Sequence, residues 1–279
     1  MGNILWIASY PKSGNTWVRT FIQNYIANET VNINTIHQKS IDEVKSFRYQ
    51  KYLPKEQNTT DLDLETICSL RPLVHSDIAQ NAHGTIFVKS HNFQGEYNSH
   101  PLYNWNVSSG AIYIIRNPLD VAISLSSYFD FSIDEAIDYM ADDMAGTPNE
   151  VENVPQVITS WSLNVSSWCQ EPSDKLLVLR YEDLLSNPKK YFRKVESFLS
   201  LKKDPKRLTR AIQASSFKNL RLQEKKHGFV EKHENAQSFF RKGSANQWKS
   251  ILSKEQIKRI VDKHCEQMSL FKYLPPGYK

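Results

Sequence analysis

Residues 9–21 read SYPKSGNTWVRTF and continue a short apolar run that begins at Ile4. That run is typical of a buried strand from Ile4 to Ser9, and apolar side chains then recur at the spacing of a helix over about residues 15–28. A loop containing Gly14 joins the two elements. This order of strand, tight loop and helix places free backbone N–H groups at the N-terminus of the helix, where they favour an anion. The stretch therefore predicts an α/β fold with an anion-binding loop.

Side chains in this loop have the chemistry of a phosphate site, but their order is unusual. The nucleotide-triphosphate loop G-x-x-x-x-G-K-[ST] carries its lysine after the last glycine, whereas Lys12 precedes Gly14. Lysine adds a point charge, and short donors surround it: Ser13, Asn15 and Thr16. The alternative is an ordinary helix capped by a loop side chain, with Trp17 in the core. The clustering of lysine, serine, glycine and threonine favours the anion site, where Trp17 offers a face to a base.

Further apolar runs have the length and composition of buried strands: TIFVK (Thr85–Lys89), AIYII (Ala111–Ile115) and KLLVL (Lys175–Leu179). Helical patterns alternate with them, near residues 62–70, from Pro118 onwards, and over residues 133–144 and 154–170. The rest of segment 29–80 is polar and irregular, a loop is predicted at 180–183, and the remainder is helical except for about 225–250. Short strands alternating with helices predict a central, mostly parallel sheet with helices on both faces.

Parallel sheets bind ligands at the carboxyl ends of their strands. The residues that follow the predicted strands are polar and mostly cationic: Tyr10-Pro11-Lys12, Lys89-Ser90-His91, Arg116-Asn117 and Arg180-Tyr181. We therefore expect these side chains to converge on one edge of the sheet.

Composition limits the class of protein. The chain has 279 residues, which suits one domain over residues 1–279, and its net charge is +5. Lysine and arginine are spread along the chain and form no long block, so no nucleic-acid partner is predicted. The three cysteines are far apart and indicate neither a disulfide framework nor a metal cluster. The first residues lack a basic region, and their apolar run is too short for a signal peptide or a membrane span. We expect a cytoplasmic protein without a membrane partner.

Two later stretches carry anion-binding side chains as well. In IIRNPLDVAISLSSYF (Ile114–Phe129), Arg116 at a strand end can bind a phosphate through two N–H groups, and Ser124 follows one to two helical turns later. In FFRKGSANQWKS (Phe239–Ser250), two cations precede Gly243 in a predicted loop. Each stretch alone is also compatible with an ordinary capped helix or a solvated basic loop.

The ordered set of motifs resembles the sulfotransferases that use 3′-phosphoadenosine 5′-phosphosulfate (PAPS), especially the cytosolic branch. YPKSGNTW is similar to the family's 5′-phosphosulfate loop, the stretch from Arg116 to Ser124 to its 3′-phosphate motif, and RKG…WK at 241–249 to its carboxyl-terminal signature. Tyr181-Glu182-Asp183 and Ser215-Ser216-Phe217 also fall where family members carry matching residues. The resemblance covers roughly residues 4–272 and implies a single-domain fold like that of nucleotide kinases (P-loop-like).

The resemblance implies a role for each matching residue. The 5′-phosphosulfate would be held by Lys12, Ser13, Gly14, Asn15 and Thr16. The 3′-phosphate would be held by Arg116, Ser124, Arg241, Lys242 and Gly243. Trp17 and Phe217 would sandwich the adenine, while Tyr181 and Ser215 would bond near the base and sugar. The implied catalytic set is His91, Lys12, Lys89 and Ser124.

His91 matches the family's catalytic histidine. An imidazole titrates near neutrality and can take the acceptor's proton as the sulfuryl group arrives. Sulfuryl transfer parallels phosphoryl transfer, so charge on the departing oxygen has to be neutralised, for which Lys12 and Lys89 are the candidates. The leaving group is a phosphate, already stable as an anion, so no metal is expected.

One departure from the family pattern bears on the site. Members commonly have Gly-Asp before the tryptophan of the last motif, where this chain has Asn246-Gln247. The substitution puts the geometry of that loop in question.

Three functions follow from these motifs. The first is transfer of a sulfuryl group from PAPS to a hydroxyl or amine of a small-molecule acceptor. A nucleotide-triphosphate-dependent kinase is the second, although the lysine order and the lack of an acidic residue at a strand end disfavour it. The third is a non-catalytic nucleotide-binding module.

The acceptor and the oligomeric state cannot be predicted. The acceptor pocket is expected to be lined by variable segments at about 29–80, 128–150 and 225–240. Its aromatic candidates are Tyr10, Phe93 and Tyr128.

Overall fold

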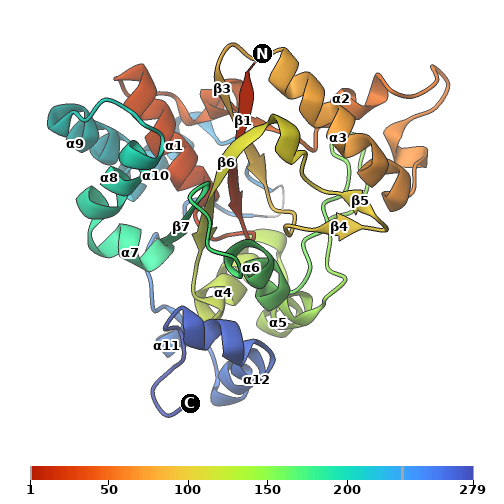
Figure 1. The fold of residues 1–279 in the computed structure, drawn as a ribbon. Helices are drawn as coiled ribbons and strands as arrows, with labels where there is room; N and C mark the ends of the chain where they lie inside the picture. The colour runs from red at the N-terminus through yellow and green to blue at the C-terminus, as the bar shows by residue number, and fades with distance from the viewer. Residues whose placement is uncertain (1, 234–235, 279) are drawn as a thin grey trace.

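The computed structural model describes residues 2–233 and 236–278, so residues 1 and 279 of the predicted domain and residues 234–235 of the predicted acceptor segment lie outside the described part (Figure 1). Five strands of the described part form a parallel sheet in the order β2-β3-β1-β6-β7. They are β1 (Asn3–Ser9), β2 (Ser40–Asp42), β3 (Thr85–Ser90), β6 (Ser108–Ile115) and β7 (Leu176–Arg180). The predicted α/β fold with a central parallel sheet is confirmed.

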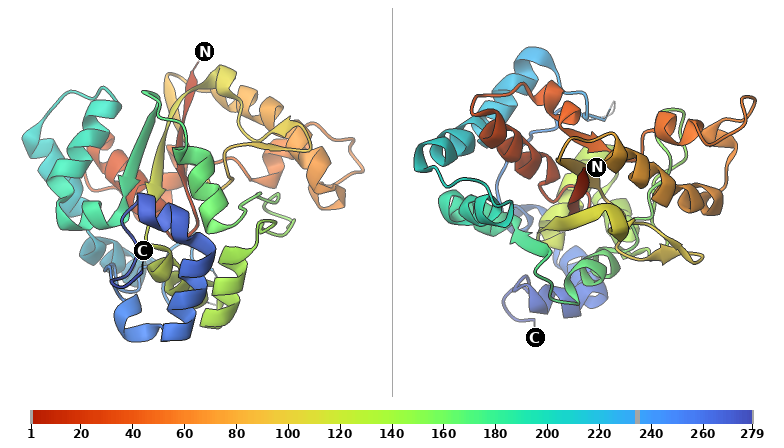
Figure 2. Two further views of the ribbon diagram at one scale, coloured as in Figure 1. Left: turned by 60° about the horizontal axis from the view of Figure 1, so that its bottom comes forward. Right: turned by 45° about the horizontal axis from the view of Figure 1, so that its top comes forward.

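Helices cover both faces of this sheet (Figures 1 and 2). They are α1 (Asn15–Ala27), α2 (Ser46–Gln50), α3 (Leu64–Gln80), α4 (Pro118–Phe129), α5 (Ile133–Ala141), α6 (Trp161–Cys169), α7 (Tyr181–Ser186), α8 (Pro188–Phe198), α9 (Pro205–Ala214), α10 (Phe217–His227), α11 (Trp248–Ile251) and α12 (Lys254–Leu270). Short 3₁₀ turns lie at Ile33–Gln38, Thr59–Asp61 and Trp105–Val107, and β4 (Glu96–Tyr97) pairs with β5 (His100–Pro101) as a small antiparallel hairpin. None of the helices in the described residues is long and apolar enough to cross a membrane.

The central strand β1 divides the core into two layers. Ile4, Trp6 and Ala8 point to one face, where they pack with α3, α4 and α6. Leu5 and Ile7 point to the other, where they pack with α1, α8 and α9. Because both faces are covered, the strand reads as an uninterrupted apolar run, which is typical of parallel sheets.

Two helix predictions are corrected by the structure. The helix expected near residues 62–70 continues to Gln80 and contains Pro72. Proline in a helix interior removes a hydrogen bond, but the turns after it bury Val74 and Ile78 in the core, and this packing keeps them helical. The residues expected as a loop at 180–183 instead begin α7 at Tyr181.

Other boundaries differ from the predicted ones as well. The helix predicted over 154–170 begins only at Trp161, after its N-cap Ser160. Residues 154–160 are extended because they bond to the loop after β3: the N–H of Val157 donates to the Asn92 side chain at 2.7 Å. The helix predicted over 133–144 ends at Ala141. Strand β2 and the β4–β5 hairpin lie in segments without an apolar run and were missed.

A buried ion pair links β2, α3 and this extended segment. Arg71 on α3 donates to both carboxylate oxygens of Glu43, at 3.1 and 2.9 Å, and to the carbonyl of Pro155. Asn92 donates to the same carboxylate at 2.8 Å. The side chains of Arg71 and Glu43 are 0% and 1% exposed. The pair therefore fixes both the edge strand and the loop that follows β3.

Removing one partner of this pair is expected to destabilise the fold. Arg71→Met leaves the Glu43 carboxylate buried without a cation, so we expect the free energy of unfolding to fall by about 3–5 kcal/mol. The double variant Glu43→Leu/Arg71→Met should recover much of that loss. Denaturant unfolding measures both, with the more exposed Arg48→Met as control. Equal loss in the single and double variants would contradict the ion-pair explanation.

The same pair predicts a dependence of stability on pH. Burial alone would raise the pKa of Glu43, but the charge of Arg71 dominates and lowers it to about 2. Since this pKa is lower than in an unfolded chain, the stabilisation is present above about pH 4.3 and is lost as the pH falls towards 2. The double variant should show a smaller change in unfolding free energy over that range.

Candidate functional site

The loop after β1 is shaped for an anion. Lys12 and Gly14 have left-handed φ values of 64° and 107°. Gly14 is the N-cap of α1, which has no side-chain capping bond. The ordinary capped helix considered above is therefore not what the chain forms. Asn15 instead donates to the carbonyl of Ile7 at 2.8 Å and ties the helix start to β1. The first-turn N–H groups of α1 thus have no side-chain cap and are suited to an anionic ligand.

Gly14 is required for space as well as for its φ value. A Cβ atom there would lie 2.8 Å from the ring of Tyr181. The guanidinium of Arg116 lies over the same ring at 4.4 Å. Arg116 also donates to the carbonyls of Lys12 at 2.9 Å and Ser244 at 3.4 Å. One arginine therefore joins the first loop to the carboxyl-terminal motif.

Donors around the loop are left without partners in the described residues. The Ser13 hydroxyl and the Arg116 Nε are buried and make no hydrogen bond there. Buried polar groups are normally paired. Two orphan donors beside an uncapped helix N-terminus fit the phosphate groups of a nucleotide.

The carboxyl-terminal loop, which lacks the expected Gly-Asp pair, is held by hydrogen bonds to Asp120. Asn246 has φ 62°, a conformation that asparagine tolerates better than most residues. Its N–H donates to Asp120 at 2.7 Å, and the N–H of Trp248 donates to the other carboxylate oxygen at 3.1 Å. Asparagine thus takes the left-handed conformation that a glycine would supply.

Phe217 and Gly243 meet at the same loop. A Cβ atom on Gly243, whose φ is 60°, would lie 2.1 Å from the Phe217 ring. Arg241 donates to Gln247 at 3.0 Å, and Lys242 is exposed. The ring of Trp17 lies edge-on to Tyr181, with centroids 5.6 Å apart.

Lys12 is enclosed by aromatic rings. Its Nζ lies 3.4 Å from the ring centre of Tyr128 and 4.2 Å from that of Phe239. Burial, reinforced by the charge of Arg116, lowers the pKa of Lys12 well below its ordinary value. An anion bound beside it would offset that effect. Tyr128, predicted as an acceptor contact, therefore lies against the loop after β1.

Two residues that the sequence did not single out complete this side of the loop. Arg19 on α1 donates to both carboxylate oxygens of Glu231 at 2.7 and 2.6 Å, and Thr16 donates to one of them at 3.4 Å. The Tyr128 hydroxyl donates to the carbonyl of Glu231 at 2.8 Å. Arg19 follows Thr16 by three residues and so lies on the same face of the helix. This spacing could have identified Arg19 from the sequence as a residue near the loop. Glu231, in a polar stretch distant in sequence, gave none.

His91 lies at the end of β3 with a defined tautomer. Its Nδ1 is 2.8 Å from the carbonyl oxygen of Ser9. A carbonyl only accepts, so Nδ1 carries the hydrogen and the Nε2 lone pair is available as a base. Burial, followed by the charge of Lys89, lowers the pKa of His91 to about 3. The imidazole is therefore neutral near pH 7.

Lys89 is held by an ion pair that was not predicted. Its Nζ lies 2.8 Å from Asp42, the residue beside it in β2. The pair neutralises a cation that stands two residues before His91. Strand β2, at the edge of the sheet, thus supplies the carboxylate that balances Lys89, a charge that acts on the imidazole.

The remaining predicted residues lie in different settings. Tyr10 is fully buried in the core, so the structure does not place it at an acceptor surface. Phe93 is half-buried and packs over Gly95. The buried Ser215 hydroxyl donates to the carbonyl of Ala211 at 2.8 Å, within α9. Ser124 is half-buried on α4.

Comparisons with known proteins agree with this geometry. The model of the sulfotransferase domain family matches residues 3–272. Mouse sulfotransferase 1B1 is 26% identical over 276 residues, covering 94% of this chain and 82% of the relative. The flavonol 3-sulfotransferase of Flaveria bidentis is 25% identical, covering 92% and 79%.

Solved structures show the same fold. A mouse sulfotransferase complexed with PAP superimposes with a TM-score of 0.62 at 18% identity, covering 95% of this chain and 84% of that one. Retinol dehydratase in complex with androsterone and PAP superimposes with a TM-score of 0.63 at 17% identity, covering 95% and 80%.

Position 246 offers a test of the carboxyl-terminal loop. Asn246→Gly should leave PAP binding within about twofold, because glycine adopts the same φ freely. Asn246→Val should weaken it about tenfold, since a β-branched residue is strained at positive φ by about 1–2 kcal/mol. Titration calorimetry with PAP measures both. Equal affinities for the two variants would show that this backbone conformation does not matter for binding.

Proposed function

We propose that this chain, which belongs to the sulfotransferase domain family, transfers a sulfuryl group from PAPS to a hydroxyl or amine of a small-molecule acceptor. One observation carries the proposal. The neutral imidazole of His91 and the uncapped N-terminus of α1 are both fixed to the end of β1, through Ser9 and Ile7. A base and an anion site are thereby held at the same edge of the sheet.

The donor would be held by two groups of residues. The 5′-phosphosulfate fits the loop from Lys12 to Thr16, where the Ser13 hydroxyl lacks a partner in the described residues. The 3′-phosphate fits Arg116 with the 241–243 loop, since the Arg116 Nε is likewise unpaired. The aromatic rings of Phe217 and Trp17 suit the adenine of the donor. Tyr181, whose ring lies between Gly14 and the Arg116 guanidinium, suits the adenosine as well. Ser215 would need another rotamer to reach it, and Ser124 would reach the 3′-phosphate from α4.

The chemistry follows from the tautomer of His91. Its Nε2 would take the proton of the acceptor as the acceptor's oxygen or nitrogen bonds to sulfur. The bond between sulfur and the phosphate oxygen breaks, and the electron pair leaves with PAP. Lys12 would neutralise the charge on that phosphate oxygen. Lys89, paired with Asp42, would stabilise charge without moving.

The acceptor would enter on the β2–β3 side of His91. Phe93 and Tyr128 are the aromatic candidates for its walls, with segments 29–80, 128–150 and 225–240 around them. Among the similar proteins, retinol dehydratase was solved with androsterone, a small molecule. This supports a small organic acceptor rather than a particular one.

The direct test is incubation with PAPS and a broad panel of phenols, alcohols and amines. We expect a sulfonated product by mass spectrometry. Phosphorylated product with ATP and magnesium, and none with PAPS, would favour the kinase. Tight binding of PAP without turnover on any acceptor would favour the non-catalytic module.

His91→Ala should separate catalysis from binding. Removing a general base lowers kcat by about 10²–10⁴-fold, while the Kd for PAP should stay within about threefold. His83→Ala, at an exposed histidine, serves as the matched control and should retain full activity. Full activity of His91→Ala would remove the assignment of the base.

The lowered pKa of His91, about 3, predicts the shape of the pH profile. The base form is already present above that pH. We therefore expect kcat/KM to show no loss of activity through pH 6.5, where an ordinary histidine titrates. An acidic limb near pH 6.5 that disappears in His91→Ala would contradict this environment for the imidazole.

A further inference from the structure

Basic residues are concentrated in one part of the chain. Residues 188–227 contain thirteen lysines and arginines but three acids, a net charge of +10. The whole chain carries +5, so the remaining residues together carry −5. These forty residues form α8, α9 and α10. The asymmetry is far larger than the mild overall charge indicates.

Each of the three acids in this segment is used inside the fold. Glu196 is fully buried, where it accepts from the Tyr25 hydroxyl and pairs with Arg193 at 3.3 Å. Asp204 caps α9 by accepting from the N–H groups of residues 206 and 207. Glu224 accepts from the N–H groups of residues 239 and 240 at 2.6 and 2.9 Å. None of the three is classed as exposed.

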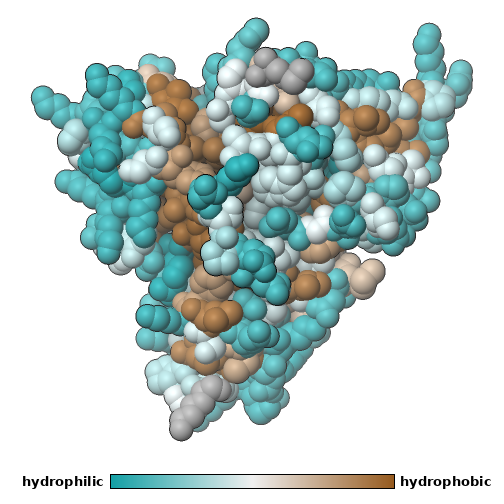
Figure 3. Space-filling model, viewed as in Figure 1, coloured by the Kyte–Doolittle hydropathy of each residue, from teal (hydrophilic) through white to brown (hydrophobic). Residues whose placement is uncertain are grey.

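The cations, in contrast, face solvent. Eleven of the thirteen are exposed. They are Lys189, Lys190, Lys194, Lys202, Lys203, Lys206, Arg210, Lys218, Arg221, Lys225 and Lys226. Helix α9 packs against both α8 and α10, and the three lie on one flank of the molecule (Figures 1 and 2), which is covered by hydrophilic residues (Figure 3). We call this surface the cationic flank.

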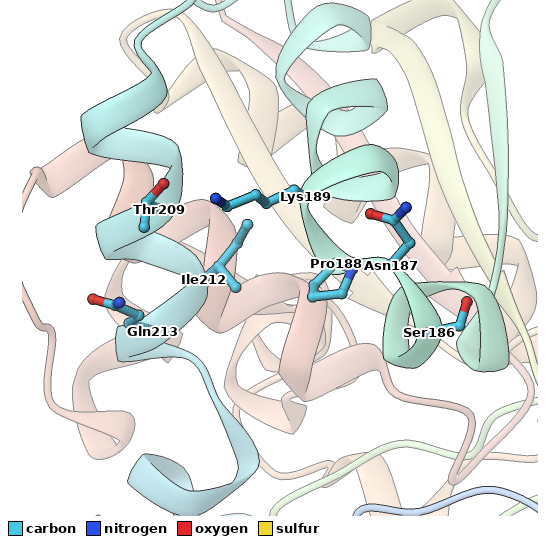
Figure 4. Close-up of a pocket in the computed structure, with 7 residues that line it drawn as sticks. All are labelled: Ser186, Asn187, Pro188, Lys189, Thr209, Ile212 and Gln213. Carbon is cyan, nitrogen blue, oxygen red and sulfur yellow. The ribbon is translucent and has the colours of Figure 1, made fainter.

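An open hollow of about 370 Å³ lies within the cationic flank, between the start of α8 and α9. Figure 4 shows the Lys189 side chain extending from α8 towards Thr209 and Ile212 of α9. The side chains of Asn187 and Gln213 also line it. A lysine ammonium, a hydroxyl and two amides beside an apolar floor suit the phosphate and the first carbons of a phospholipid headgroup.

We propose that the cationic flank docks the protein on a membrane rich in anionic phospholipids. Each lysine near such a surface adds an attraction that accumulates over the patch. Nine of the thirteen cations are lysines, which bind as point charges without the planar fork that reads bases. Leu222, 56% exposed beside Arg221 and Lys225, adds the apolar contact typical of interfacial helices. These features favour a lipid surface over a nucleic acid.

The position of the cationic flank gives docking a consequence for the site. Helix α10 is followed by residues 229–233 and 236–240, in which Glu231 pairs with Arg19 and Phe239 lies beside Lys12. Phe229 and Phe240 pack with Leu220 of α10. A bilayer that contacts α10 would therefore lie near the residues that pack against the loop after β1. The proposal departs from the expectation of no membrane partner and does not depend on the sulfotransferase activity.

Sedimentation with vesicles tests it. The full chain should bind vesicles of phosphatidylcholine mixed with phosphatidylserine, bind poorly to phosphatidylcholine alone, and be released by high salt. The variant with Lys189, Lys194, Lys203 and Lys206 all changed to Glu should bind far less. At about fivefold per lysine, its partition coefficient should fall by at least about two orders of magnitude. Its thermal unfolding midpoint and its PAP affinity should stay unchanged.

A matched variant distinguishes an effect of where the lysines lie from an effect of the net charge of the protein. Lys39, Lys55, Lys175 and Lys254 are exposed and lie outside the cationic flank, and changing all four to Glu gives the same net charge. This variant should keep most of the binding to phosphatidylserine vesicles. Equal loss in both variants, or no binding of the unaltered chain at low salt, would overturn the proposal. Tighter binding to a duplex oligonucleotide than to the vesicles, at the same salt concentration, would overturn it as well.

Discussion

The hydrogen bond from the guanidinium of Arg116 to the carbonyl of Lys12 ties the loop after β1 to the end of β6. The same guanidinium lies on the ring of Tyr181 and reaches Ser244. Four distant parts of the chain, represented by Lys12, Arg116, Tyr181 and Ser244, thus meet at one guanidinium group. The terminal N–H groups of Arg116 donate to backbone carbonyls and so hold the loop after β1. The Nε of Arg116 remains unpaired in the described residues. A fixed donor directed at a ligand needs no reorganisation when charge arrives.

The other side of His91 is organised by pairs of opposite charge. Lys89 is paired with Asp42, and Arg19 with Glu231. Buried pairs gain little net stability but are costly to separate. Each of the two cations that act on the imidazole is therefore balanced by its own carboxylate. The sheet order β2-β3-β1 makes this possible, since it puts Asp42 and Lys89 side by side.

The sequence predicted the parts of the site that lie close together along the chain. The strand, loop and helix from Ile4 to Ala27 form as expected because local spacing and one glycine determine them. Asp42, Glu231 and the Glu43–Arg71 pair could not be foreseen, since each depends on which segments the folded chain brings together. Helix α3 runs on past Pro72 for the same reason: packing of later turns outweighs a local signal. The expectation that basic residues are spread along the chain was wrong: residues 188–227 carry a net charge of +10, a concentration that a search for long runs does not detect.

The contact between His91 and Ser9 has a consequence for how the site tolerates change. The oxygen nearer to Nδ1, at 2.8 Å, belongs to the main chain of β1, while the Ser9 hydroxyl lies 3.3 Å away. Every amino acid at position 9 supplies the same carbonyl. The imidazole of His91 is therefore oriented by a main-chain group of a buried strand, and replacing the side chain at position 9 leaves that acceptor in place.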